Sequence, residues 1–288
     1  GADAYGIEVT TVNGFCNDLM QRHPARFQDY GRIEQLSDIE RFHILNTIID
    51  QLPSQSAIIS PKDRYGRTSD ILSRISDVKR EGISINRLHE VAAQYRTEME
   101  NKSRPGTKVH ARNLKMAAQY EDFVTIFTQY QQLLQERGRY DYDDMILRVI
   151  SALRDEEWLR AVLQERYQYV LVDEMQDLNG SQNMVIELLT SLPGAVGDPN
   201  IFIVGDDDQA IYRFQGASVE GMIAFRNRFP ACPVITLTAS FRSTQQILNA
   251  ATSLIGNNTL RIASALPHIA KTLVSHRSDP NGPEPALR

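Results

Sequence analysis

The sequence predicts an α/β protein whose parallel sheet is interrupted by a long all-helical block. Beyond residue 138, short continuous apolar runs alternate with amphipathic helical patterns, as in parallel strands that helices cover on both faces. From about residue 27 to residue 137, apolar residues instead recur at helical spacing, with little sign of strands. The 288 residues are enough for one large domain or two smaller ones.

Each element follows from the apolar spacing and from the turn residues that bound it. We predict a strand over 7–12, closed by Asn13-Gly14, and then a helix through Phe15 and Met20. Five or so helices fill the block, and Pro or Gly separates them at 52–54, 60–61, 81–82 and 104–106. Later helices are predicted over 144–153, 156–166, 182–189 and 244–254, and later strands over 169–172, 201–204 and 234–237.

The composition narrows the class of protein. No apolar run of about 18 residues is present, and the first residues lack the basic and apolar parts of a secretory signal, so we expect a cytoplasmic protein without a membrane span. Cys16 and Cys232 lie outside any Cys/His spacing, and we expect plain thiols. The net charge is −5, but residues 60–115 hold thirteen Lys or Arg against seven Asp or Glu, so basic charge is concentrated there.

Acidic and amide side chains directly follow two of the predicted strands. Asp173, Glu174 and Gln176 come after the apolar run 169–172, which we expect to be buried, and residues 205–209 (GDDDQ) follow the next strand. Ligands of open parallel sheets bind beyond the carboxyl ends of the strands. Two adjacent carboxylates suit Mg²⁺ chemistry, because one can hold the ion while the other accepts a proton from water. The ordinary alternative is that these acids only cap the following helix.

Two further features favour a site for phosphates and nucleic acid. Arg242 lies between a predicted strand and a helix, where its guanidinium could reach phosphate oxygens; a surface salt bridge is the alternative. Tyr212 and Phe214 follow the second acidic segment and could offer a face to a base; a place in the core is the alternative.

Together these segments resemble the UvrD/Rep family of superfamily 1 helicases. The string VDEMQD resembles motif II of that family, VGDDDQAIYRFQGA resembles motif III, and LTASFRSTQQIL resembles motif IV. Motif III is the most specific, because it separates this family from the RNA-helicase relatives. VTTVNGFCNDLM resembles the DNA-contacting motif Ib, and YDYDDMI resembles the segment that precedes motif II.

The resemblance implies an incomplete RecA-like motor of the P-loop NTPase class. Residues 1–27 would be the first part of motor domain 1A, 28–137 the inserted helical subdomain 1B, 138–232 the remainder of 1A with motifs II and III, and 233–288 motif IV with the start of motor domain 2A. The activity implied is ATP-driven movement on DNA, with 3′-to-5′ polarity. The partners implied are single-stranded DNA or a single-strand/duplex junction, and possible repair or replication proteins.

The resemblance also implies roles for individual residues. Asp173 would bind Mg²⁺, and Glu174 would activate the hydrolytic water. Gln209 would sense the γ-phosphate of ATP, Arg242 would stabilise the transferring phosphoryl group, and Gln176 would belong to the same nucleotide site. The residues it implies to contact DNA are Tyr212, Phe214 (where many relatives have Trp), Thr11 and Asn13 (in place of His). Separately, the basic stretch 60–115 would touch DNA phosphates; the alternative is that its long side chains are only solvated. The candidates there are Lys79, Arg80, Lys102, Arg104 and Lys108.

Several parts of such a motor are missing from the sequence. We expect motifs V and VI, with most of motor domain 2A, to lie beyond this segment in a longer helicase. A Gly-rich loop ending in GK[ST] must cradle the β- and γ-phosphates, and no such string occurs in the 288 residues. We therefore expect a piece of a longer helicase that alone hydrolyses little or no ATP. Two alternatives stay open: a non-catalytic helicase-like module that binds DNA or a partner, and an unrelated Mg²⁺-dependent phosphohydrolase built from Asp173, Asp206 and Asp208.

Overall fold

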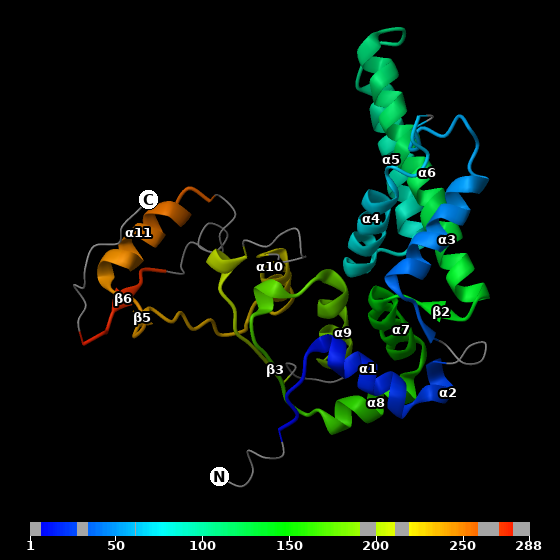
Figure 1. Ribbon diagram of the computed structural model, residues 1–288. Helices are drawn as coiled ribbons and strands as arrows, with labels where there is room; N and C mark the ends of the chain where they lie inside the picture. Colours follow the sequence, from blue (N-terminus) through cyan, green and yellow to red (C-terminus); the bar gives the residue numbers. More distant parts are fainter. Residues whose placement is uncertain are drawn as a thin grey trace. The chain divides into compact units, whose positions relative to one another are not determined.

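The structure is a computed structural model that describes residues 7–27, 34–60, 62–190, 200–210, 219–258 and 271–278 (Figure 1). Contacts within the chain divide it into two compact units. The first unit comprises Gly1–Tyr167 and Gly180–Leu192, and the second comprises Gln168–Asn179 and Pro193–Arg288. No helix among the described residues combines the length and the apolar character needed to cross a membrane.

The predicted helical block is present in the first unit. Its described residues form four helices rather than five: α3 (Asp38–Gln51), α4 (Thr68–Arg80), α5 (Ile85–Asn101) and α6 (Lys108–Glu136). Ser37, Ser84 and Thr107 begin three of these helices by accepting a hydrogen bond from a backbone N–H of the first turn. The predicted breaks at Gly82 and Gly106 are confirmed, since both glycines have positive φ angles between consecutive helices.

Two apolar cores hold the first unit together. The first core lies among α3, α4 and α6 and contains fully buried side chains such as Leu45, Ile75 and Phe127. The second core joins α1 (Val12–Arg22), α2 (Pro24–Phe27), α7 (Tyr142–Asp155), α8 (Glu157–Arg166) and α9 (Gly180–Thr190). A short parallel pair, β1 (Glu34–Gln35) with β2 (Arg139–Tyr140), precedes α3 and α7. Burial of Cys16 in the second core raises the pKa of its thiol to about 12.

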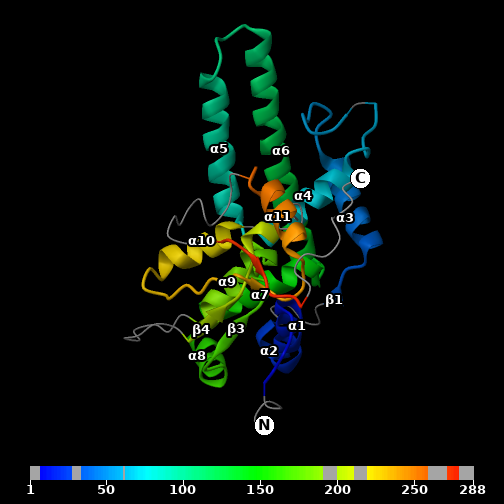
Figure 2. The ribbon, with the colours of Figure 1, turned by 90° about the vertical axis from the view of Figure 1, so that its left-hand side faces the viewer.

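Helices α5 and α6 form a long hairpin (Figure 2). The rings of Tyr95 and Tyr120 pack against each other with centroids 4.7 Å apart. Arg96 on α5 bonds Glu100 on its own helix and Glu121 on α6, at 2.9 and 3.0 Å. These contacts join the two helices.

The predicted strand over 7–12 is wrong. Residues 7–11 have no regular structure, and the side chains of Ile7 and Val9 are 66% and 90% exposed. Helix α1 begins at Val12, because the Thr11 hydroxyl accepts a hydrogen bond from the Gly14 N–H at 3.0 Å. A strand needs a neighbouring strand for its backbone hydrogen bonds, and none of the described strands lies beside this segment.

The second unit contains the predicted parallel strands. β3 (Val170–Val172) pairs in parallel with β4 (Ile201–Ile203), and a 3₁₀ turn follows each strand: η2 (Met175–Asp177) and η3 (Asp207–Gln209). α10 (Val219–Arg228) comes next along the chain. The remaining elements are β5 (Ala239–Ser240), α11 (Gln245–Ile255) and β6 (Val274–Ser275), with β5 and β6 again parallel.

Two expectations for the second unit are corrected. The run 169–172 is not buried throughout, because Tyr169 and Leu171 are 73% and 72% exposed while Val172 is only 8% exposed. Side chains alternate across a strand, and no described element covers the face that carries Leu171 and Phe202. The strand over 234–237 is also wrong: this segment is irregular, and strand pairing begins only at Ala239.

Candidate nucleotide site at the ends of two parallel strands

The two polar segments leave the same edge of the β3–β4 pair. Val172 and Ile203, the last residues of the two strands, are direct neighbours in the register. The backbone pairing continues past them, since the Val204 N–H donates to the Val172 carbonyl at 2.8 Å and the Met175 N–H donates to the Val204 carbonyl at 2.9 Å. The two loops that carry the acidic residues therefore begin side by side.

Glu174 has a strained backbone at this edge. Its φ of 50° and ψ of 46° lie in the left-handed region, and it is the single non-glycine residue with positive φ in the described part of the chain. Such a conformation costs on the order of 1–3 kcal/mol and persists where surrounding contacts hold it. Here the Glu174 N–H donates to Oδ1 of Asp173 at 3.0 Å, and the Glu174 carbonyl accepts from the Asp177 N–H at 2.8 Å. Strain of this kind clusters at functional sites.

Gln176 joins the two loops with both ends of its amide. Its side chain is 1% exposed; Nε2 donates to Oε2 of Glu174 at 2.6 Å, and Oε1 accepts from the Asp206 N–H at 2.9 Å. Gly205 makes this approach possible, because a Cβ there would lie 2.8 Å from the Gln176 oxygen. The glutamine thus fixes the Glu174 carboxylate relative to the loop that carries Gln209.

Asp206 organises the second loop. Its Oδ1 accepts from the Asp208 N–H at 3.1 Å, and its Oδ2 accepts from Nε2 of Gln209 at 2.9 Å. The carboxylates of Asp206, Asp207 and Asp208 offer oxygens that all lie within 4.8 Å of one another. Lys271 meets this charge, and its ammonium contacts all three carboxylates. Because Asp206 and Asp208 are engaged by a lysine, the geometry does not favour the phosphohydrolase reading.

Asp173 offers a carboxylate that could hold a magnesium ion. Its side chain is exposed, and one of its oxygens accepts the Glu174 N–H. Mg²⁺ in nucleotide sites takes one or two protein carboxylates and completes its shell with water and phosphate oxygens. A solvent-accessible carboxylate at the end of a strand matches that requirement.

The structure does not bring Arg242 to the other predicted residues. Asp173, Glu174, Gln176 and Gln209 lie together through the contacts given above. Arg242 is exposed beyond β5, and its guanidinium makes no hydrogen bond or ion pair with any residue that the structure describes.

The residues predicted to contact DNA near the motifs have different outcomes. Tyr212 and Phe214 lie outside the described residues. Thr11 uses its hydroxyl to cap α1, and Oδ1 of Asn13 accepts from Nε2 of Gln182 at 2.8 Å. Both side chains therefore have structural contacts within the protein, and their contact with DNA stays a prediction.

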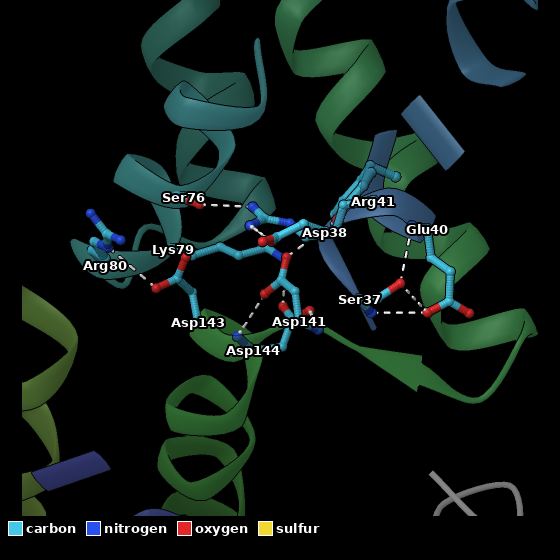
Figure 3. Close-up of polar contacts among 11 residues, drawn as sticks. Ser37, Asp38, Glu40, Arg41, Ser76, Lys79, Arg80, Asp141, Asp143 and Asp144 are labelled. Carbon is cyan, nitrogen blue, oxygen red and sulfur yellow. Dashed lines mark hydrogen bonds and ion pairs between the residues drawn. The ribbon is translucent and has the colours of Figure 1, made fainter. Parts of the chain in front are cut away.

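Lys79 is a correction to the predicted DNA contacts (Figure 3). Its side chain is 0% exposed, and its ammonium lies 2.6 Å from Asp141 Oδ2 and 2.7 Å from Asp144 Oδ1. It also lies 5.0 Å from the centre of the Tyr130 ring. A lysine with no accessible surface cannot meet a DNA phosphate. The sequence shows that Lys79 is basic, but it does not reveal that its side chain faces the start of α7.

The two aspartates beside Lys79 form the capping box of α7. The Asp144 N–H donates to the Asp141 side chain and the Asp141 N–H donates to the Asp144 side chain, both at 3.0 Å. Burial opposes ionisation of Asp141, but the charge and hydrogen bond of Lys79 outweigh it and lower its pKa. Burial raises the pKa of Asp144 despite the same lysine. Arg80, next to this cluster, is 39% exposed and pairs with Asp143 at 3.3 Å.

The exposed basic charge gathers instead at the turn of the α5–α6 hairpin. Residues 101–119 contain no Asp or Glu. The basic tip, as we call it, consists of Lys102, Arg104, Lys108, Arg112 and Lys115, all exposed. Lys102 pairs loosely with Glu98 at 3.7 Å, and the other four have no ion pair in the described part of the chain. Lys108, Arg112 and Lys115 follow the i, i+4, i+7 spacing of one helix face.

A cavity of about 500 Å³ lies elsewhere, in the first unit. Its lining includes Arg26, Gln135, Asp144 and Arg148, and it includes neither Glu174 nor Gln209. Since acidic and basic side chains are mixed around it, the cavity does not define a ligand class.

Over most of its length the chain is similar to known DNA helicases. A model of the UvrD/REP helicase N-terminal domain matches residues 1–230. The chain is 30% identical over 265 residues to the ATP-dependent DNA helicase PcrA of Bacillus subtilis, which covers 91% of this chain and 31% of PcrA. It is 33% identical over 152 residues to the ATP-dependent DNA helicase Rep of Buchnera aphidicola, covering 53% of this chain and 23% of Rep. The chain therefore spans less than a third of these relatives.

Proposed function

Because this chain belongs to the UvrD/Rep helicase family, we propose that it is part of an ATP-dependent DNA helicase that moves 3′ to 5′ on single-stranded DNA in repair, replication or recombination. One observation carries the nucleotide site in this proposal. The side chain of Gln176 joins Glu174, at the end of β3, to the loop that carries Gln209, at the end of β4. If the carboxylate of Glu174 and the amide of Gln209 act on the same nucleotide, they must be held close to each other, and the contacts of Gln176 do this.

The proposed roles follow from the chemistry of the side chains. Glu174 accepts a proton from the attacking water, and Gln209 donates a hydrogen bond to the γ-phosphate. Asp173 would hold Mg²⁺, directly or through water; the ion supplies charge neutralisation at the phosphates. The Arg242 guanidinium, which has no ion pair in the described structure, is available to stabilise charge on the transferring phosphoryl group. We assign residues 1–27 and 138–232 to motor domain 1A, 28–137 to subdomain 1B and 233–288 to the start of 2A.

The test compares ATP hydrolysis by the longer protein that includes this chain with hydrolysis by this chain alone. With single-stranded DNA present, we expect the longer protein to turn over roughly 1 ATP per second or more, within the range common for enzymes. We expect far slower turnover by this chain, since its sequence lacks the GK[ST] loop. A longer protein that binds DNA but never hydrolyses ATP would contradict the proposal and support the non-catalytic module.

We further propose that the basic tip binds DNA phosphates. Four of the five exposed cations of the basic tip have no ion pair in the described part of the chain, so little internal pairing competes with a polyanion for them. Binding of this kind releases counterions from the DNA, so the affinity should fall steeply as salt concentration rises.

Neutralising two residues of the tip should weaken DNA binding and flatten its salt dependence. In a Lys108→Gln/Arg112→Gln variant, we consider the plot of the logarithm of the DNA association constant against the logarithm of salt concentration. Its slope should become less steep by about 0.7 for each lost contact with a single-stranded DNA phosphate. Fluorescence anisotropy with a labelled oligonucleotide measures this slope. The control is Lys62→Gln/Arg74→Gln, which removes one exposed Lys and one exposed Arg elsewhere on the same unit. Equal slopes for the two variants would show that the tip has no special role.

A further inference from the structure

The triple-aspartate segment after β4 has an electrostatic problem that the motif by itself does not solve. The carboxylates of Asp206, Asp207 and Asp208 offer oxygens within 4.8 Å of one another, and Asp207 is only 5% exposed. Like charges at such distances repel, and partial burial strengthens the repulsion. A nearby cation is required if all three are to stay ionised beside a polyanionic nucleotide.

Lys271 supplies that cation. It lies 65 residues beyond Asp206, just before β6, and its side chain is 17% exposed. Its ammonium contacts Asp206 Oδ1 and lies 2.6 Å from Asp207 Oδ1 and 2.9 Å from Asp208 Oδ2. Burial opposes the charge on the lysine, but the hydrogen bonds that its ammonium donates to the three carboxylates outweigh it and raise the pKa of Lys271.

Asp206 transmits the position of Lys271 to Gln209. One oxygen of its carboxylate meets the ammonium of Lys271, while the other accepts the Gln209 side-chain amide at 2.9 Å. The Asp206 N–H is held by the buried Gln176. With the backbone and one oxygen fixed, the second oxygen has a defined place, and so has the amide that it binds.

We propose that Lys271 is a positioning residue that acts through Asp206 to orient Gln209 toward the γ-phosphate of ATP. This inference rests on the proposed function of the nucleotide site. Without the ammonium, three adjacent carboxylates must separate or take up a proton, and Asp206 then no longer holds Gln209 in place. Lys271 lies within residues 233–288, which we assign to the second motor domain, so this contact also ties that segment to the loop after β4.

Hydrolysis kinetics of the longer protein test the role in catalysis. Lys271→Met should lower kcat by about tenfold or more, the effect of one misplaced catalytic contact, while the Kd of a non-hydrolysable ATP analogue changes less. Lys271→Arg, which keeps the charge, should recover most of the rate. Lys271→Met combined with Gln209→Ala should be no slower than Gln209→Ala alone, because both changes remove the same contact. Lys62→Met, at an exposed lysine, is the matched control.

A second measurement on this chain alone separates the inference from the proposed function. The measurement is the NMR signal of the Gln209 side-chain amide, which is assigned by its loss in Gln209→Ala. We expect its chemical shift to change in Lys271→Met and to stay the same in Lys62→Met. The inference would be overturned if the Gln209 amide signal does not change in Lys271→Met. It would also be overturned if the losses of rate from Lys271→Met and Gln209→Ala multiply in the double variant. If the signals shift but the wild-type longer protein hydrolyses no ATP, the proposed function fails while the physical link between Lys271 and Gln209 stands.

Discussion

Replacing Glu174 by Gln is expected to lower the rate of ATP hydrolysis by the longer protein about 10²–10⁴-fold, the usual contribution of a general base. The substitution removes the carboxylate that would take the proton from water and keeps the size of the side chain. Its amide oxygen can still accept the hydrogen bond from Gln176, so the link between the two loops should survive. Steady-state kinetics with saturating ATP and single-stranded DNA measure the change.

Nucleotide binding provides the complementary measurement. The Kd of a non-hydrolysable ATP analogue should change little in Glu174→Gln, because in the proposed mechanism this residue acts on the water and not on the bound phosphates. The matched control is Glu165→Gln, the same chemical change at an exposed position on α8. Hydrolysis that continues at the wild-type rate in Glu174→Gln would rule out this residue as the base.

Replacing Lys79 by Met should be the most destabilising single change in the first unit among those considered. It removes the ammonium that contacts both Asp141 and Asp144, at a place where Lys79 is 0% exposed. Breaking a buried ion pair by removing one partner costs about 3–5 kcal/mol, because the remaining charge is left uncompensated. We expect the chain to unfold at a correspondingly lower urea concentration. Far-ultraviolet circular dichroism, which reports mainly on the helices, measures the midpoint of unfolding.

Two further variants distinguish this mechanism from a general loss of packing. Lys102→Met removes a lysine whose side chain is 60% exposed and should change the free energy of unfolding by less than about 1 kcal/mol. Lys79→Met combined with Asp144→Asn should recover part of the loss, since Asn removes one uncompensated charge and still offers an oxygen to the Asp141 N–H. No recovery in the double variant would mean that the charge of Asp144 is not the cause.

Local patterns predicted most of the helices well. Ser37, Thr107 and Asp141 cap helices that the apolar spacing had indicated, and α3, which Ser37 begins, ends just before the predicted break at 52–54. Helix ends depend on hydrogen bonds between residues three or four apart, which a sequence displays directly. The strands were less predictable, because their hydrogen bonds go to residues distant in the chain. Residues 7–12 and 234–237 were predicted to be strands, yet neither segment has a strand beside it in the described structure.

The sequence by itself determined which residues form the polar ends of β3 and β4 and to which family they belong, because short motifs record chemistry residue by residue. Only the tertiary structure decided which charges are available. It buried Lys79 between two aspartates, left the basic tip exposed, and placed Lys271 among Asp206, Asp207 and Asp208. The physical reason is that a side chain's charge is fixed by its type, whereas its partners and its exposure depend on segments far away in the chain.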